Sequence, residues 1–232
     1  MNIGSSTDFS IDARSLHERV YDTMRQALLQ GRFKAGQTLT IRELASELKT
    51  SEMPVREAIK TLVAEKMLAQ LPNRSFIVPR LGVAEFSDLI DLRILLEGMA
   101  VRAVAASADA DLVAALRAAN DNMREAVAQN SNLDVLRHNQ EFHFLIYRAG
   151  AASIRIEVIE MLWTRCGPYM AEALFEMSDM SVAMTRATDF HDGIVDAIAK
   201  GDPEAAFASL EQDLLGASGW YRSFIEQRAD AR

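Results

Sequence analysis

The stretch TIRELASELKTSEMPVREAIKTLVAEKMLAQLPNRSFIVPR, from Thr40 to Arg80, decides the fold of the first third of the chain. It holds two helical patterns separated by a turn at residues 49–51. It ends in a β-branched segment at 71–78, around the turn residues Pro72 and Asn73. Two short helices, a tight turn and a β-hairpin make up a winged helix-turn-helix, which places one helix in the major groove of DNA. The stretch therefore predicts a DNA-binding domain.

Local signals around this stretch predict where the helices begin and end. Ser15 and Thr40 are each followed three residues later by Glu, which makes two capping boxes at helix starts. Gly31 is typical of the position just after a helix. Pro54 is tolerated in the first turn of the third helix, because its missing N–H would be unpaired there anyway. We expect this third helix to run to about Met67.

The remainder of the chain is helical throughout, with no strand pattern and no phosphate-binding glycine loop. Asp109 and Asp202 are expected N-caps, and Gly150 and Gly201 are expected stops. The predicted fold class is mainly α, with a flexible tail at 1–12, a winged helix-turn-helix domain at 13–80 and an all-helical domain at 81–229. The six helices expected in the second domain span 83–107, 109–129, 132–149, 153–176, 179–200 and 203–228.

Charge is divided between these two parts. Residues 1–80 contain 12 Lys and Arg against 9 Asp and Glu, whereas residues 81–232 contain 13 against 24. A formal net charge of −8 excludes a general nucleic-acid coat, and a structural DNA-bundling protein would need more positive charge. A basic N-terminal part on an acidic body fits a protein that contacts DNA through that part alone.

Composition restricts the location and the redox chemistry. No stretch approaches about 20 uninterrupted apolar residues, so we expect no membrane span. The N-terminus lacks a basic region followed by an apolar run, which predicts a cytoplasmic protein. The single cysteine, Cys166, cannot form an intrachain disulfide, and its apolar surroundings predict a buried structural thiol.

The N-terminal region resembles the GntR family of bacterial transcription regulators. The segment PVREAI at 54–59 is similar to the family's recognition helix, and GRFKAGQTL at 31–39 is similar to a glycine-containing stretch that precedes it. The resemblance covers about residues 14 to 80. It implies a dimeric regulator that reads a pseudo-palindromic operator in double-stranded DNA.

The resemblance also implies which residues contact DNA, and where this chain departs from the family. Arg42 and Arg56 match family positions that face DNA. Glu52 replaces the usual arginine and Met53 the usual threonine or serine, while Ser75 replaces the glycine of the wing. Glutamate repels phosphate but can accept from cytosine N4, so the operator cannot be inferred from relatives. The candidate DNA-binding residues are Arg42, Ser51, Glu52, Met53, Arg56, Lys60 and Arg74.

Polar residues inside the helical domain resemble the effector-binding FCD domain of the FadR-like branch, and six helices resemble its VanR-like subgroup. Asn139 and His143 lie one helical turn apart, and His191 and Asp213 lie on the last two helices. In the family, an Asp and three His at these positions hold a divalent metal, so the resemblance implies a zinc, nickel or manganese site here. Asn139 stands at the usual Asp and Asp213 at the usual last His.

These positions leave three interpretations open. His143, His191 and Asp213 can hold a metal with Asn139 as a weak fourth ligand. Alternatively, the same residues bind an organic effector directly after loss of the metal. In the third interpretation, the two histidines are hydrogen-bonded core residues.

Arg93, on the first helix of the bundle, matches the family's effector-binding arginine. Either a small organic acid pairs with its guanidinium or Glu97, one turn later, does so internally. The candidate effector-binding residues are therefore Arg93, Asn139, His143 and His191.

The sequence as a whole favours a ligand-responsive, homodimeric repressor of a metabolic operon that responds to a small organic acid. A metal-dependent enzyme built on the helical bundle is the alternative, since two histidines and a carboxylate can bind a catalytic metal. No general base is evident beside them, because Glu141 projects away from His143 on the same helix, and an enzyme would have no use for the DNA-reading domain.

Overall fold

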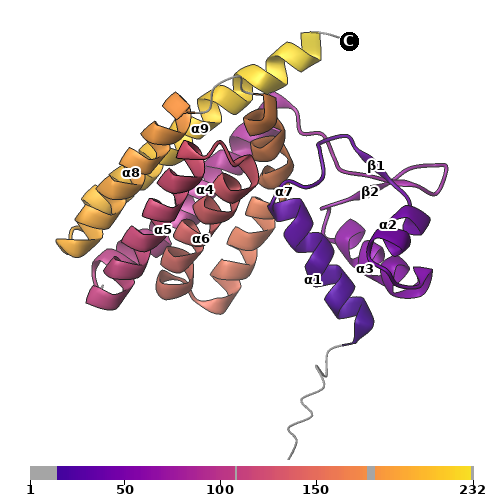
Figure 1. Cartoon of the computed structure of the whole chain (residues 1–232), viewed down its shortest axis with the longest axis horizontal. Helices are drawn as coiled ribbons and strands as arrows, with labels where there is room; N and C mark the ends of the chain where they lie inside the picture. The colour runs from indigo at the N-terminus through magenta and orange to yellow at the C-terminus, as the bar shows by residue number, and fades with distance from the viewer. Residues whose placement is uncertain (1–14, 108, 177–180, 231–232) are drawn as a thin grey trace, which may run out of the picture.

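The computed structural model describes residues 15–107, 109–176 and 181–230. The expected tail at 1–12 lies outside these residues. The described chain forms two parts, a small N-terminal domain with a sheet and a larger bundle of helices (Figure 1). No helix among the described residues is long and apolar enough to cross a membrane.

The N-terminal domain is the predicted winged helix-turn-helix. Its core is formed by buried apolar side chains of all three helices, such as Met24, Leu44 and Ile59. The strands form one antiparallel sheet in the order β1-β3-β2, with Leu39 and Gln70 both opposite Phe76. Its elements are α1 (Leu16–Leu29), β1 (Thr38–Leu39), α2 (Ile41–Glu47), α3 (Glu52–Ala64), β2 (Ala69–Gln70) and β3 (Phe76–Ile77).

The predicted helix starts are confirmed by the hydrogen bonds at their ends. The backbone N–H and hydroxyl of Ser15 donate to Glu18 at 2.6 and 2.7 Å. The Thr40 hydroxyl oxygen accepts from the Glu43 N–H at 3.2 Å. Gly31 follows α1 with a φ of 66°, the left-handed conformation that glycine adopts without strain.

Two predicted boundaries near the wing are wrong. Helix α3 ends at Ala64 rather than at Met67, because Lys66 adopts a left-handed φ of 59° and turns the chain so that Met67 is buried in the core. The first wing strand therefore begins at Ala69, before the expected segment 71–78.

The wing turn shows how the chain does without the family's glycine. Arg74, not Ser75, takes the left-handed conformation, with a φ of 65°. Asn73 Oδ1 accepts from the backbone N–H and the hydroxyl of Ser75 at 3.1 and 2.5 Å, and the Leu71 N–H donates to the Ser75 carbonyl at 2.9 Å. The turn is thereby closed with an exposed arginine at its tip.

The six helices expected in the second domain are confirmed, with differences of at most two residues at the described boundaries. The expected first two residues of the fifth helix, 179 and 180, lie outside the described residues. Asp109 accepts from the Leu112 N–H at 2.7 Å and Asp202 from the Ala205 N–H at 3.0 Å, as their predicted roles as N-caps require. The helices are α4 (Val83–Ala105), α5 (Ala110–Ala128), α6 (Asn132–Gly150), α7 (Ser153–Glu176), α8 (Ser181–Ala199) and α9 (Pro203–Asp230).

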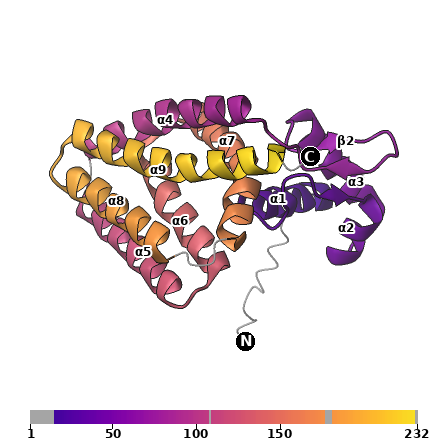
Figure 2. The same cartoon turned by 90° about the horizontal axis from the view of Figure 1, so that it is seen from above.

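The bundle is layered so that α4 lies beside α9 and α5 lies between α6 and α8 (Figures 1 and 2). Buried apolar and aromatic side chains from all six helices fill its centre, among them Leu116, Phe142, Tyr147, Trp163 and Ile194. Cys166 is buried, as expected, and burial raises the pKa of its thiol.

Helix α7 also forms the contact between the bundle and the N-terminal domain, because α1 packs against it. Gly167 on α7 lies so close to the end of α1 that an added Cβ would be 2.5 Å from the Leu28 carbonyl oxygen. A Cβ added to Gly31 would be 2.0 Å from that of Ala171. Beside these contacts Arg25 of α1 pairs with Glu160 of α7 at 2.6 Å. At these two glycines the end of α1 and helix α7 therefore pack so closely that no side chain fits between them.

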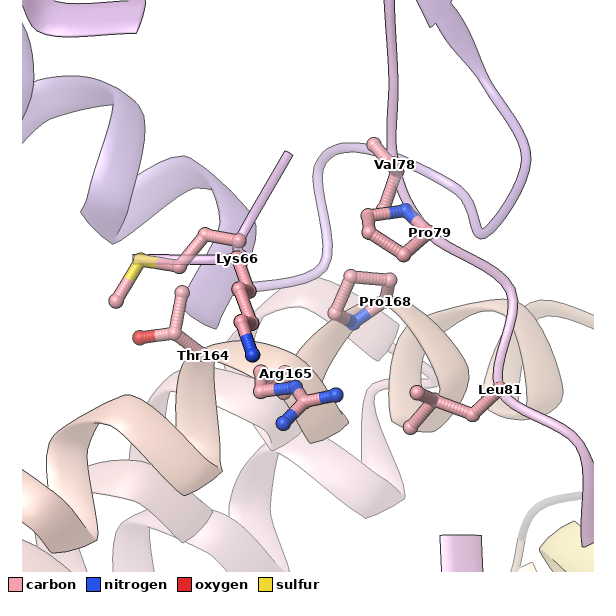
Figure 3. Close-up of a pocket in the computed structure, with 8 residues that line it drawn as sticks. Lys66, Val78, Pro79, Leu81, Thr164, Arg165 and Pro168 are labelled. Carbon is pink, nitrogen blue, oxygen red and sulfur yellow. The ribbon is translucent and has the colours of Figure 1, made fainter. Parts of the chain in front are cut away.

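A small pocket opens between the N-terminal domain and α7 (Figure 3). The side chains of Lys66 and Arg165 bring two positive charges to it from the two domains. The lining residues are Lys66, Met67, Val78, Pro79, Leu81, Thr164, Arg165 and Pro168.

Candidate functional site

The residues expected to contact DNA share one feature, which is exposure on the helix-turn-helix or the wing. Met53, at the start of α3, is 63% exposed although it is apolar. Ser51 is the N-cap residue of α3, and Arg74 is at the tip of the wing. The exposed set comprises Arg42, Ser51, Glu52, Met53, Arg56, Lys60 and Arg74.

The anion at the start of α3 pairs with the arginine one turn later. Glu52 Oε2 lies 3.5 Å from Arg56 Nη2, and their side chains are 54% and 48% exposed. Exposed pairs of this kind contribute about 0–1 kcal/mol, so a phosphate or a base edge can replace Glu52 as the partner of Arg56. The substitution at Glu52 thus lowers the free positive charge of the recognition helix without removing its arginine.

A second cluster lies at the centre of the bundle. His143 comes from α6, His191 from α8 and Asp213 from α9, and all three are buried. The Nε2 atoms of the two histidines lie 3.2 and 3.8 Å from Asp213 Oδ2. One possible ligand atom from each residue lies within 4.8 Å of the others. The fold thus joins three polar groups that are far apart in sequence.

His191 is oriented from α5 and stays neutral. Its Nδ1 lies 3.1 Å from Asn120 Oδ1, and its ring stacks on Phe142 at a centroid distance of 3.9 Å. Burial lowers the pKa of His191 to about 3, against the opposing effect of Asp213. Its Nε2 is buried and has no hydrogen-bond partner among the described residues.

His143 is oriented from the other side by a chain of hydrogen bonds. Its Nδ1 lies 3.0 Å from the hydroxyl oxygen of Tyr147, which donates its own proton to Glu97. With that proton committed, Nδ1 is the donor to Tyr147. On the other side of the ring, Nε2 lies against the Asp213 carboxylate. Burial raises the pKa of Asp213, but the hydrogen bond from His143 and the charges of both histidines outweigh burial and lower it.

Arg93 ends the same hydrogen-bond chain. Its Nε donates to Glu97 Oε1 at 2.8 Å, and Nη1 lies 3.5 Å from Cys166 Sγ. The guanidinium stands 4.4 Å over the Trp163 ring, whose Nε1 also donates to Glu97, at 3.0 Å. Burial would lower the pKa of Arg93, but the Glu97 charge raises it. In this structure Arg93 therefore has the internal partner that its i, i+4 spacing allows.

Comparison with known proteins agrees with both parts. Residues 88–215 match the FCD domain, and residues 16–78 match the bacterial regulatory proteins of the gntR family. The chain is an FCD-domain member of the GntR family. Relatives and family alike are transcription regulators, so this GntR-family protein is a DNA-binding regulator, and the alternative of a metal-dependent enzyme is not supported.

Similar proteins cover most of the chain. The HTH-type transcriptional regulator McbR of Escherichia coli (strain K12) is 31% identical over 163 residues, which are 69% of this chain and 74% of that protein. A probable D-xylose utilization operon transcriptional repressor of Paenarthrobacter nicotinovorans is 26% identical over 88% of each chain. The solved structure of E. coli McbR/YncC superposes with a TM-score of 0.83 at 25% identity, over 93% of this chain and 99% of that one.

The central cluster of this GntR-family protein fits a divalent metal by its donor chemistry. Two imidazole nitrogens and a carboxylate are a common three-residue donor set for such an ion. Both Nε2 atoms face the same carboxylate oxygen, and the one on His191 has no hydrogen-bond partner among the described residues. A cation between these atoms would satisfy all three groups. Asn139 is half-buried, one turn before His143 on α6, and its role as a fourth ligand stays a prediction.

Sequence reasoning missed the residues that hold the two histidines. Tyr147 lies one turn after His143, a spacing that could have indicated the contact. Asn120 lies 71 residues before His191, on a helix of its own, and no local pattern connects them.

Proposed function

We propose that this regulator is a dimeric repressor of a metabolic operon, and that a divalent metal and a small organic acid in its bundle change its affinity for the operator. The proposal rests on the buried cluster of His143, His191 and Asp213, in which His191 Nε2 has no hydrogen-bond partner within the described part of the chain. The similarity to the probable D-xylose utilization operon transcriptional repressor supports the proposed sign of regulation.

The metal would be held by His143, His191 and Asp213, with Asn139 as a weak fourth group. Three protein ligands leave coordination positions open for a carboxylate from outside. Because Glu97 already occupies the Arg93 guanidinium, we assign the effector's carboxylate to the metal and give Arg93 an indirect role, through Glu97 and Tyr147.

A dimer would place two recognition helices on the two half-sites of a pseudo-palindrome. Helix α4 supports this proposal with an apolar stripe of Leu92, Leu95 and Met99, which are 47%, 59% and 44% exposed. The spacing puts these three side chains on one face of the helix. A second copy of the chain, packed by the same face, would cover them.

One set of measurements tests the proposal. Thermal unfolding with added zinc, nickel or manganese reports metal binding, because a ligand of the native state raises the melting temperature. Operator affinity is then measured by fluorescence anisotropy with metal and a panel of organic acids, and the titration also gives the number of chains per operator. His143→Ala with His191→Ala should abolish the metal response and keep DNA binding. An unchanged melting temperature with every metal would refute the metal site.

Arg56→Ala should weaken operator binding by roughly 1–3 kcal/mol if Arg56 reads a base, or reduce the salt slope by about one unit if it contacts phosphate. Anisotropy titrations at several salt concentrations separate these outcomes. Arg137→Ala is the matched control, since its side chain on the bundle surface is 49% exposed against 48% for Arg56. Equal affinity and equal salt slope in both variants would remove Arg56 from the interface.

A further inference from the structure

The buried amide of Asn120 has only one orientation that satisfies its surroundings. Asn120 is fully buried on α5, and its Nδ2 donates to the Thr188 carbonyl and to Asp192 Oδ1, both at 2.9 Å. These contacts use both hydrogens of the NH₂ group. A flipped amide would place its oxygen against two acceptors, so the oxygen must face the other way.

In this orientation the amide oxygen of Asn120 faces the imidazole ring of His191. Asn120 Oδ1 lies 3.1 Å from His191 Nδ1, and a carbonyl oxygen only accepts hydrogen bonds. Nδ1 must therefore carry the proton of the neutral ring, which leaves the lone pair on Nε2, the atom that faces Asp213. The tautomer of His191 follows from the environment of Asn120.

The stacking of Phe142 on the His191 imidazole cannot select the tautomer of the ring. The two rings are nearly parallel, with an interplanar angle of 8°. Stacking holds the plane of the ring but does not distinguish one ring nitrogen from the other. The hydrogen bond from Asn120 makes that distinction.

We propose that Asn120 is the positioning residue of the bundle site, which locks His191 as the Nδ1–H tautomer and thereby presents Nε2 to a divalent cation. This inference rests on the proposed metal site. Asp192 anchors the amide, and the Arg124 guanidinium donates to Asp192 in turn. A hydrogen-bonded chain thus runs from the surface of α5 and α8 to His191 Nδ1, on the side of the ring opposite Nε2.

The first test measures the tautomer and the metal affinity of Asn120→Leu in the full-length protein. The leucine is similar in size but offers His191 no acceptor. The chain has only four histidines, so the ¹⁵N shifts of the metal-free imidazoles can be assigned one by one. We expect His191 to change from one tautomer to a mixture, and zinc affinity measured by calorimetry to fall about 10- to 100-fold.

A control separates positioning from mere stability. Asp196→Asn breaks an exposed ion pair with Arg117 between the same two helices and should change neither readout.

These measurements decide the proposal whether or not the wild-type protein binds zinc. An unchanged His191 tautomer together with wild-type zinc affinity in Asn120→Leu would overturn it. If the wild-type protein binds no zinc, the proposed metal function fails. The tautomer of metal-free Asn120→Leu then still decides whether Asn120 positions His191.

Discussion

Glu97→Ala is expected to lower the free energy of unfolding of the bundle by about 3–5 kcal/mol, because it leaves the buried Arg93 cation without its counter-charge. Arg93 is 3% exposed and Glu97 is fully buried, so water cannot replace the lost carboxylate. The Trp163 N–H and the Tyr147 hydroxyl lose their acceptor at the same time. Urea unfolding followed by circular dichroism measures the change.

Two further variants show that burial causes this loss. Arg102 and Glu204 form an exposed pair between α4 and α9, with Nε and Oε1 2.8 Å apart, so Glu204→Ala should cost far less stability than Glu97→Ala. Arg93→Met with Glu97→Leu removes both charges and should be far less damaging than Glu97→Ala alone. Equal losses for Glu97→Ala and Glu204→Ala would contradict the pairing of Arg93.

Gly31→Ala is expected to cost about 2–5 kcal/mol and to undock the N-terminal domain from α7. About 1–2 kcal/mol arises from a side chain in the left-handed conformation, and about 1–3 kcal/mol from overpacking. The overpacking arises because the new Cβ would lie 2.0 Å from the Ala171 Cβ. Calorimetry should then show a separate, earlier transition for the N-terminal domain.

Gly201→Ala is the matched control for the docking contact. Gly201 has a φ of 67° against 66° for Gly31, but its added Cβ would lie 3.8 Å from the nearest atom, an ordinary contact. Gly201→Ala should therefore show only the cost of the left-handed backbone conformation. Its calorimetric trace should show no separate, earlier transition for the N-terminal domain. If Gly31→Ala behaves like Gly201→Ala, the two domains do not depend on the Gly31 contact.

Helix positions were predictable because the signals for them are local. A cap such as Asp109 or Asp202 acts on a backbone N–H three residues away, so the sequence carries the whole interaction. The end of α3 was not predictable, since Lys66 takes a left-handed conformation that favours glycine, and burial of Met67 and Leu68 compensates for it.

The candidate site was predictable only in part, for a related reason. The pair Arg93–Glu97 lies within one helix, so its spacing made the contact foreseeable. The meeting of His143, His191 and Asp213 depends on how three helices pack, and only the resemblance to the FCD domain indicated it. The role of Asn120 depends on a fourth helix and on the direction of one buried amide, which no sequence pattern encodes.

Helix α7 touches both halves of the protein. Trp163 contacts Glu97 and the His143 ring, while Glu160, one turn earlier, pairs with Arg25 of the N-terminal domain. A coupling free energy between two binding sites has the same size from either side. In a regulator coupled through α7, operator DNA would therefore act as an effector of the metal, and zinc affinity should change on adding the operator by the same factor as operator affinity changes on adding zinc.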